Sequence, residues 1–274
     1  MLSLIIGILI RIFSNSYLNV FQKLLTQKGE FSSVINFYTY LGLTIIGFCI
    51  CPFPEFNIQF LPYILSMGCL GALGNFFIIK ALSCGELSAI APINSYKPIV
   101  ALLFGIIILK EYPNIPELLG ILLILIGTFI LAKSKIFFTK ATLYRFIALI
   151  LLGTEAIFIK KVILLTDINS TFLYWVATGF IFSILFAIGA KHPVKIKYSN
   201  VKFQLALVFL VAIMQYTTNY VFAKINVAYA LALFQLSTIT SLLIGANFFK
   251  EKDFTIKLIA SIIMLIGAII IILS

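Results

Sequence analysis

The chain has 274 residues, of which 62% are hydrophobic and 11% are charged, and its mean hydropathy is +1.15. Because soluble domains carry about 25% charged residues, this composition excludes a soluble domain and a disordered chain, and four cysteines are too few for a disulfide scaffold. The excess of 20 Lys and Arg over 9 Asp and Glu lies mostly in short loops between apolar runs. It therefore indicates membrane orientation and not a nucleic-acid-binding face.

A window of about 20 residues, the length that crosses a bilayer, finds ten apolar segments. In chain order they are Leu2–Leu25, Ser32–Cys51, Phe60–Ala81, Leu87–Leu109, Ile115–Ala132, Ala141–Leu164, Ser170–Ala190, Val201–Ala223, Val227–Phe249 and Ile256–Leu273. Short turn signals rich in proline and charged residues separate them. We predict an all-α, multi-pass integral membrane protein with ten transmembrane helices, in which the first segment is a permanent span and not a signal peptide.

The chain also resembles itself when it is shifted by about half its length. The matched positions include Lys23 with Lys160, Gly42 with Gly179, Asn75 with Asn219, Lys110-Glu111 with Lys250-Glu251, and Gly127 with Gly267. We predict two five-helix units, residues 1–137 and 138–274. Because five is odd, the second unit enters the membrane from the opposite side, and such inverted repeats are typical of secondary transporters with a substrate site between the repeats.

The stretch from Ala81 to Gly127, with Lys97-Pro98 and Lys110-Glu111 inside it, resembles the EamA-type repeat of the drug/metabolite transporter superfamily. Ala230–Leu273 resembles the same repeat more loosely. The resemblance implies a ten-helix carrier, in a membrane such as a prokaryotic inner membrane, with a central cavity lined mainly by helices 1, 3, 4, 6, 8 and 9. It leaves the substrate open. Many members carry Glu-Pro where this chain has Lys97-Pro98, and we expect a base in place of an acid to change the charge of the preferred cargo.

Three charged residues lie too deep in their segments to belong to loops. Arg11 is about ten residues into the first segment, Lys97 is similarly deep in the fourth, and Glu155 is deep in the sixth. Each costs about 2.5 kcal/mol or more in hydrocarbon, so we expect all three to face a wet or paired interior. Either Glu155 only neutralises one of the two cations, or it also takes part in cargo or proton handling.

Polar and aromatic residues extend this candidate substrate-binding set. On the first segment Arg11, Asn15 and Asn19 recur at helical spacing and form one polar stripe. The other candidates are Asn75, Tyr96, Gln215 and Asn219. Instead of binding substrate, the stripe could form hydrogen bonds between helices. Pro92 and Pro98 lie six residues apart in one segment, so we expect a hinge there, with a static kink as the alternative.

Enzyme functions are not supported by any motif. The single histidine, His192, stands beside a proline, no cysteines or histidines have metal-ligand spacing, and no nucleotide-binding loop occurs. We therefore predict no metal, no cofactor and no ATP hydrolysis. The predicted function is secondary transport of a small anionic or zwitterionic metabolite, such as an amino acid, a nucleotide or a phosphorylated compound. The alternative is proton-coupled export of cationic or amphipathic drugs; a membrane enzyme, a channel or a scaffold is less favoured.

The expected partners are the substrate, the lipid bilayer and either a coupling proton or an exchanged solute. Fourteen lysine and arginine residues, Arg145 among them, fall on one side of the predicted topology and four on the other. The positive-inside rule then places both termini outside, whereas the family resemblance favours termini inside. The sequence fixes neither the cargo, the direction of transport nor the oligomeric state.

Overall fold

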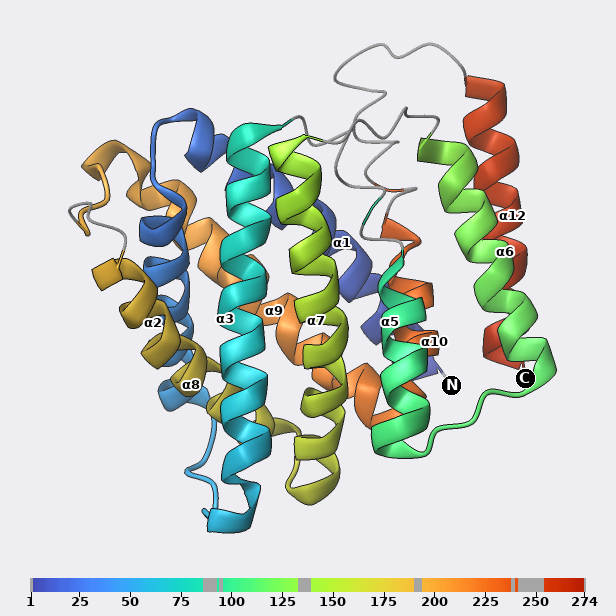
Figure 1. Ribbon diagram of the computed structural model, residues 1–274, viewed down its shortest axis with the longest axis horizontal. Helices are drawn as coiled ribbons and strands as arrows, with labels where there is room; N and C mark the ends of the chain where they lie inside the picture. The colour runs from blue at the N-terminus through green and yellow to red at the C-terminus, as the bar shows by residue number, and fades with distance from the viewer. Residues whose placement is uncertain are drawn as a thin grey trace.

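The computed structural model describes residues 2–85, 93, 96–132, 139–189, 194–237, 240 and 254–273, and these contain helices and short connections without any strand (Figure 1). The helices are α1 (Leu2–Gln27), α2 (Ser32–Ile50), α3 (Leu61–Cys84), α5 (Lys97–Phe104), α6 (Ile115–Ala132), α7 (Lys140–Leu165), α8 (Ile168–Gly189), α9 (Val201–Lys224), α10 (Val227–Phe234) and α12 (Phe254–Leu273). Two 3-10 turns, η1 (Ile58–Phe60) and η4 (Tyr198–Asn200), precede α3 and α9, and one π turn, η3 (Gly105–Leu109), continues α5.

The all-helical prediction is confirmed for the described residues. Within the described ranges, five helical stretches are long and apolar enough to cross a membrane, namely Leu2–Gln27, Ser32–Ile50, Ile58–Cys84, Ile168–Gly189 and Tyr198–Lys224. Two predicted segments are described only in part. In Leu87–Leu109 the described helix begins at Lys97, and in Val227–Phe249 it ends at Phe234; the rest of each segment lies largely outside the described residues. The protein is therefore a multi-pass membrane protein.

Each helix packs mainly on a helix from the other half of the chain. The main pairs are α1 with α9, α3 with α7, α3 with α8, α2 with α8, α5 with α10, and α6 with α12. Figure 1 shows α2 and α8 at one edge, α3 and α7 in the middle, and α6 with α12 at the opposite edge. Several polar and charged side chains, among them Arg145, Glu155 and Asn219, are buried between these pairs.

Two lysines cap the ends of equivalent helices. Lys23 Nζ donates to the carbonyl oxygens of Leu82 at 2.6 Å and Gly85 at 2.7 Å, at the end of α3. Lys160 Nζ donates to the carbonyl oxygens of Phe222 and Ile225, at the end of α9. The last carbonyls of a helix have no partner within the helix, so an ammonium group at this place satisfies them and also favours the negative end of the helix dipole.

The backbones of α6 and α12 approach each other closely where two glycines face one another. A methyl group on Gly120 would lie 2.7 Å from the carbonyl oxygen of Gly267, and one on Gly267 would lie 2.6 Å from the carbonyl oxygen of Gly120. Backbone atoms cannot move aside as a flexible side chain can. Close approach through small residues is the usual way in which membrane helices gain packing energy.

We expect Gly120→Ala to force α6 and α12 apart and to destabilise the protein by about 1–3 kcal/mol, the usual cost of overpacking. Thermal melting in detergent measures this as a lower Tm. Gly189→Ala is the matched control, because a methyl group there lies within 4 Å of no atom of the described residues; its Tm should stay unchanged or rise slightly. Equal melting of the Gly120 variant and the wild type would contradict this packing.

Candidate functional site

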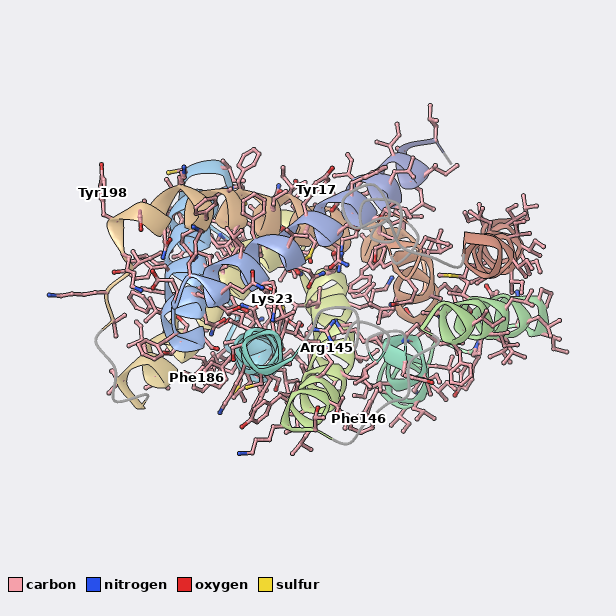
Figure 2. The ribbon with its side chains drawn as sticks, turned by 90° about the horizontal axis from the view of Figure 1, so that it is seen from above. Tyr17, Lys23, Arg145, Phe146, Phe186 and Tyr198 are labelled. Carbon is pink, nitrogen blue, oxygen red and sulfur yellow. The ribbon has the colours of Figure 1, made fainter. Side chains whose placement is uncertain are left out.

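The interior of the helix bundle is charged although its outside is apolar. Arg145, six residues into α7, is only 5% exposed, whereas the next residue, Phe146, is 53% exposed. Figure 2 shows Arg145 within the bundle and Phe146 at its periphery. The outer side chains of such a helix face lipid. Because a charged side chain in lipid costs free energy, Arg145 faces the other helices.

Glu155 lies at the junction of α3, α7 and α8. It is 6% exposed, and its Oε1 accepts a hydrogen bond of 2.6 Å from Nε1 of Trp175 on α8. On α3 the position that faces it is Gly71, where an added methyl group would lie 2.2 Å from Oε1 of Glu155 and 2.9 Å from Nε1 of Trp175. The missing side chain at Gly71 therefore makes the room that this carboxylate needs.

Arg11 reaches from α1 to two other helices. Its Nε donates to Oγ1 of Thr218 on α9 at 2.6 Å, and its guanidinium carbon lies 4.8 Å from the ring centroid of Phe234 on α10. Nη1 of Arg11 is buried and has no hydrogen-bond partner among the described residues. The same holds for Nε of Arg145. Two guanidinium groups in the interior thus keep unused donors.

Lys97 is the first residue of α5 and is half-buried. The charges of Arg145, Arg11 and Glu155 all act on it, while no hydrogen bond or ion pair of Lys97 occurs within the described part of the chain. Arg11, Lys97, Arg145 and Glu155 form what we call the central charge cluster. It combines three cations with one carboxylate, and groups with this excess of donors bind carboxylates and phosphates by charge-assisted hydrogen bonds.

The predicted amide residues are mostly engaged with other helices or with one another. Asn15 Nδ2 donates to Ser237 Oγ at 3.1 Å, next to α10, and Asn19 Nδ2 donates to the carbonyl oxygen of Asn15 at 2.8 Å. Asn75 Oδ1 accepts from Gln22 of α1 at 3.1 Å. The bonds of Asn15 to Ser237 and of Gln22 to Asn75 link α1 to other segments, whereas the bond of Asn19 to Asn15 lies within α1.

On α9, Gln215 and Asn219 are both buried and bonded to each other, Nε2 to Oδ1, at 3.0 Å. Nδ2 of Asn219 has no hydrogen-bond partner among the described residues. Tyr96 directly precedes α5 and is half-buried. Pro98 stands in the first turn of α5, where its missing N–H breaks no helical hydrogen bond. Pro92, the other predicted hinge residue, lies outside the described residues.

A second polar cluster, which the sequence did not predict, joins the two halves at one end of the bundle. Glu111 Oε1 lies 3.8 Å from Lys160 Nζ, and its Oε2 accepts from the backbone N–H of Val227 at 3.1 Å. Burial raises the pKa of the Glu111 carboxyl, and the Val227 N–H and the Lys160 ammonium oppose that rise. We call Glu111, Lys160 and Val227 the end clamp.

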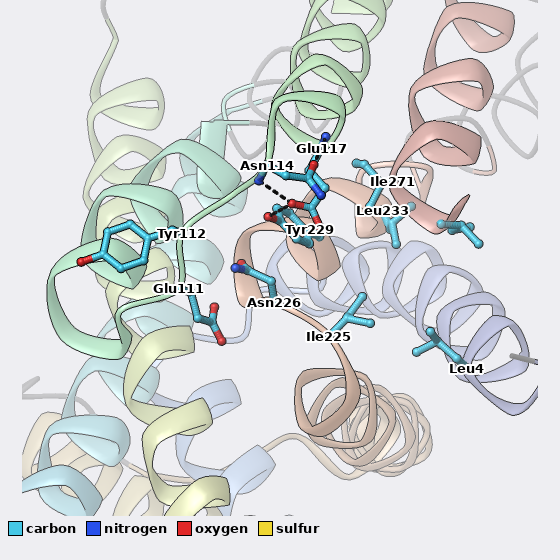
Figure 3. Close-up of a pocket in the computed structure, with 11 residues that line it drawn as sticks. Leu4, Glu111, Tyr112, Asn114, Glu117, Ile225, Asn226, Tyr229, Leu233 and Ile271 are labelled. Atoms are coloured by element: carbon cyan, nitrogen blue, oxygen red, sulfur yellow. Dashed lines mark hydrogen bonds between the residues drawn. The ribbon is translucent and has the colours of Figure 1, made fainter. Parts of the chain in front are cut away.

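Next to the end clamp is a cavity of about 510 Å³ (Figure 3). Glu111, Asn226 and Tyr112 line one side of it, and Leu4 and Ile271 line the other. Its second carboxylate, Glu117, accepts hydrogen bonds from the hydroxyl of Tyr229 and the N–H of Asn114. The cavity is therefore acidic on one wall and apolar on the opposite one.

One residue of this interior was misplaced from the sequence and another was missed. Arg145 was counted among the loop charges, although it lies inside the predicted segment Ala141–Leu164 and one helical turn before the position equivalent to Arg11. Trp175 was not among the predicted site residues, yet it is 5% exposed and donates to Glu155. The indole N–H is the signal that could have found it, because a buried indole requires an acceptor. The described residues contain no group of three His, Cys, Asp or Glu side chains that could hold a metal ion.

Comparison with known proteins agrees with the resemblance noted in the sequence. Residues 2–133 match the model of the EamA-like transporter family. An uncharacterized protein of Methanocaldococcus jannaschii is 25% identical over 141 residues, which are 48% of this chain and 98% of that protein. A crystal structure of a protein superposes with a TM-score of 0.75 at 16% identity, covering 99% of this chain and 96% of that one, and shows that the fold is shared.

We expect Trp175→Phe to destabilise the protein by about 1–3 kcal/mol, because it leaves the buried Glu155 carboxylate without its donor. Thermal melting in detergent measures the effect. Tyr40→Phe is the control: the Tyr40 hydroxyl is equally buried but has no hydrogen-bond partner among the described residues, so its loss should change the Tm little. A Trp175→Phe variant that melts at the same temperature as the wild type would contradict a stabilising role for the bond to Glu155.

Proposed function

We propose that this chain, which belongs through residues 2–133 to the EamA-like transporter family, is a secondary transporter of a small organic anion or zwitterion. The observation that carries the proposal is the central charge cluster, in which Arg145 and Glu155 are buried and Arg11 and Lys97 are half-buried. A family of transporters accounts for the membrane location. The excess of cations over carboxylates in this cluster points to cargo that carries a carboxylate or a phosphate.

The proposal includes two inverted five-helix units, residues 1–137 and 138–274, and several contacts support it. The packing of α1 on α9 has its counterpart in the packing of α3 on α7. Tyr38 of α2 donates to the carbonyl oxygen of Val194 at 3.3 Å, and Tyr174 of α8 donates to that of Glu55 at 3.2 Å. The relative from Methanocaldococcus jannaschii, which aligns over almost its whole length with about half of this chain, also agrees with a unit of half length.

Alternating access would then be a rocking of the two units about the central charge cluster. The end clamp joins Glu111 of the first unit to Lys160 and Val227 of the second. Opening toward that end of the bundle requires these contacts to break, whereas opening toward the other end does not. A gradient of an ion or of an exchanged solute supplies the energy in this scheme.

We expect Lys97→Gln to reduce uptake of an anionic cargo into proteoliposomes at least tenfold, because the variant loses one of three positive charges that face the cargo. Uptake rates of radiolabelled anions at equal protein density measure the effect. Lys202→Gln, which removes an exposed lysine of α9, is the control and should transport as the wild type does. Undiminished anion transport by the Lys97 variant would disprove this site.

A second candidate function is proton-coupled export of cationic or amphipathic compounds. The cavity beside the end clamp favours it, because its acidic wall suits an amine and its apolar wall suits a hydrocarbon group. In this function Glu155 would exchange the proton.

If Glu155 carries the coupling proton, Glu155→Gln should make efflux of an amphipathic amine independent of pH between about 5 and 8. A dye-efflux assay in vesicles with matched internal and external pH measures this dependence. Lys202→Gln again serves as the control and should keep the pH profile of the wild type. Efflux that stays pH-sensitive in the Glu155 variant would count against this alternative.

A further inference from the structure

We infer that α10 couples the end clamp to the candidate cargo site on α1, so that opening of the clamp and release of α1 from Phe234 and Ser237 occur together. Glu111 and Glu117 are then positioning residues, which act on the site through α10. This coupling rests on the proposed function, because it treats the end clamp as a gate and α1 as one wall of the cargo site.

The first turn of α10 is held by two carboxylates from a distant part of the chain. Oε2 of Glu111 accepts the backbone N–H of Val227 at 3.1 Å, and Glu117 accepts the hydroxyl of Tyr229. Glu111 follows the π turn η3, and Glu117 lies in the first turn of α6. A movement that opens this end of the bundle must therefore break both bonds or carry α10 along.

The chain at the other end of α10 contacts the polar stripe of α1. The guanidinium carbon of Arg11 lies 4.8 Å from the ring centroid of Phe234. Asn15 Nδ2 donates to Ser237 Oγ at 3.1 Å, and Ser16 Oγ donates to the carbonyl oxygen of Ser237 at 3.2 Å. Arg11 and Asn15 are candidate cargo residues, so a displacement of this end of α10 changes the surroundings of the site.

The chain between the two ends is a buried helix. All eight residues of α10 are buried, and the N–H groups of Gln235 and Leu236 donate to carbonyl oxygens one turn earlier, both at 3.0 Å. At about 1.5 Å per residue, Val227 and Ser237 are about 15 Å apart along this segment. Closely packed elements move between discrete positions and do not deform continuously. A displacement of one end is therefore transmitted to the other.

The neighbouring helix α5 makes a second connection between the same two places. Figure 1 shows α5 and α10 side by side, and they pack on each other. Lys97 is the first residue of α5, and the segment continues through η3 toward Glu111. A clamp residue and a candidate cargo residue thus stand at opposite ends of one helical segment, as they do for α10.

The test measures the reactivity of single cysteines in the full-length chain, with the four native cysteines replaced by alanine. Ser237→Cys reports the α1 end of α10, and Val227→Cys reports the clamp end; the native side chains are 6% and 0% exposed. A water-soluble methanethiosulfonate reagent labels each purified protein in detergent. The rate of labelling rises with the fraction of molecules in which α10 has left its contacts, and far-UV circular dichroism confirms that each variant is folded.

A change at the clamp end should alter the reactivity of the α1 end. Tyr229→Phe removes only the hydroxyl that binds Glu117, and we expect it to raise the labelling of Ser237→Cys about fivefold or more, as coupling between two sites usually does. Tyr174→Phe is the matched control. The Tyr174 hydroxyl also bonds to a distant part of the chain, the carbonyl oxygen of Glu55, but it lies on α8, so its loss should leave the labelling rate unchanged.

The reverse experiment starts at the α1 end, because coupling between two sites is reciprocal. Phe234→Leu removes the ring that faces Arg11 and should raise the labelling of Val227→Cys about fivefold or more. Arg11→Met should act in the same direction, and the double variant should add little, since both changes break one contact. Phe172→Leu is the control for the loss of a buried ring: Phe172 lies on α8 and is 0% exposed, and its replacement should leave the rate unchanged.

The outcomes separate this coupling from the proposed function. Labelling of Ser237→Cys that Tyr229→Phe does not change would overturn the coupling, and so would an equal rise with Tyr174→Phe, which would indicate general loosening. Either result would leave the proposed function standing if Lys97→Gln impairs anion uptake. Undiminished uptake by Lys97→Gln, together with both labelling effects, would instead disprove the proposed cargo site and support the coupling of the end clamp to α1.

Discussion

The hydrocarbon core of a bilayer supplies no water, so a charge inside this protein is stabilised by other protein groups, by cargo or by water in an internal cavity. The bond from Trp175 to Glu155 is the clearest case, since it joins α7 to α8 and depends on the space that Gly71 leaves on α3. Arg11 joins α1 to α9 and α10 in the same way. The polar interior thus holds the helices in register, while lipid-facing residues are apolar and interchangeable.

Much of the helical architecture followed from hydropathy, because a run of about 20 apolar residues has few alternatives to a membrane helix. Deep charges such as Arg11 and Glu155 were identified from their distance along the segments, which fixes depth to about one helical turn. Mean hydropathy does not show how each helix is rotated about its axis. The inward orientation of Arg145 and of Trp175 therefore does not follow from an average over 20 residues. Their partners lie on helices far away in sequence, and only the packing of α3, α7 and α8 brings them together.

The basic residues fall into two groups, those at helix ends and those in the interior, and a count along the sequence does not distinguish them. Most of them lie at helix ends, where they can interact with lipid head groups. Arg145 and Lys160 are buried, and the ammonium groups of Lys23 and Lys160 donate hydrogen bonds to carbonyl oxygens at helix ends. When Arg145 is counted with the interior and not with the loops, the same side of the membrane still has the larger number of lysines. The orientation signal and the binding signal are therefore separable once the burial of each cation is known.

The π turn at Gly105–Leu109 determines which way Glu111 points. It is followed by Lys110 in a left-handed conformation at φ 57°, and the N–H of Glu111 then bonds to the carbonyl oxygen of Gly105 at 3.2 Å. A π turn contains one residue more than an α-helical turn would use, and each residue turns a helix by about 100°. Loss of a single codon in this stretch would rotate Glu111 away from Lys160 and Val227, so related chains should tolerate substitutions here far better than changes in length.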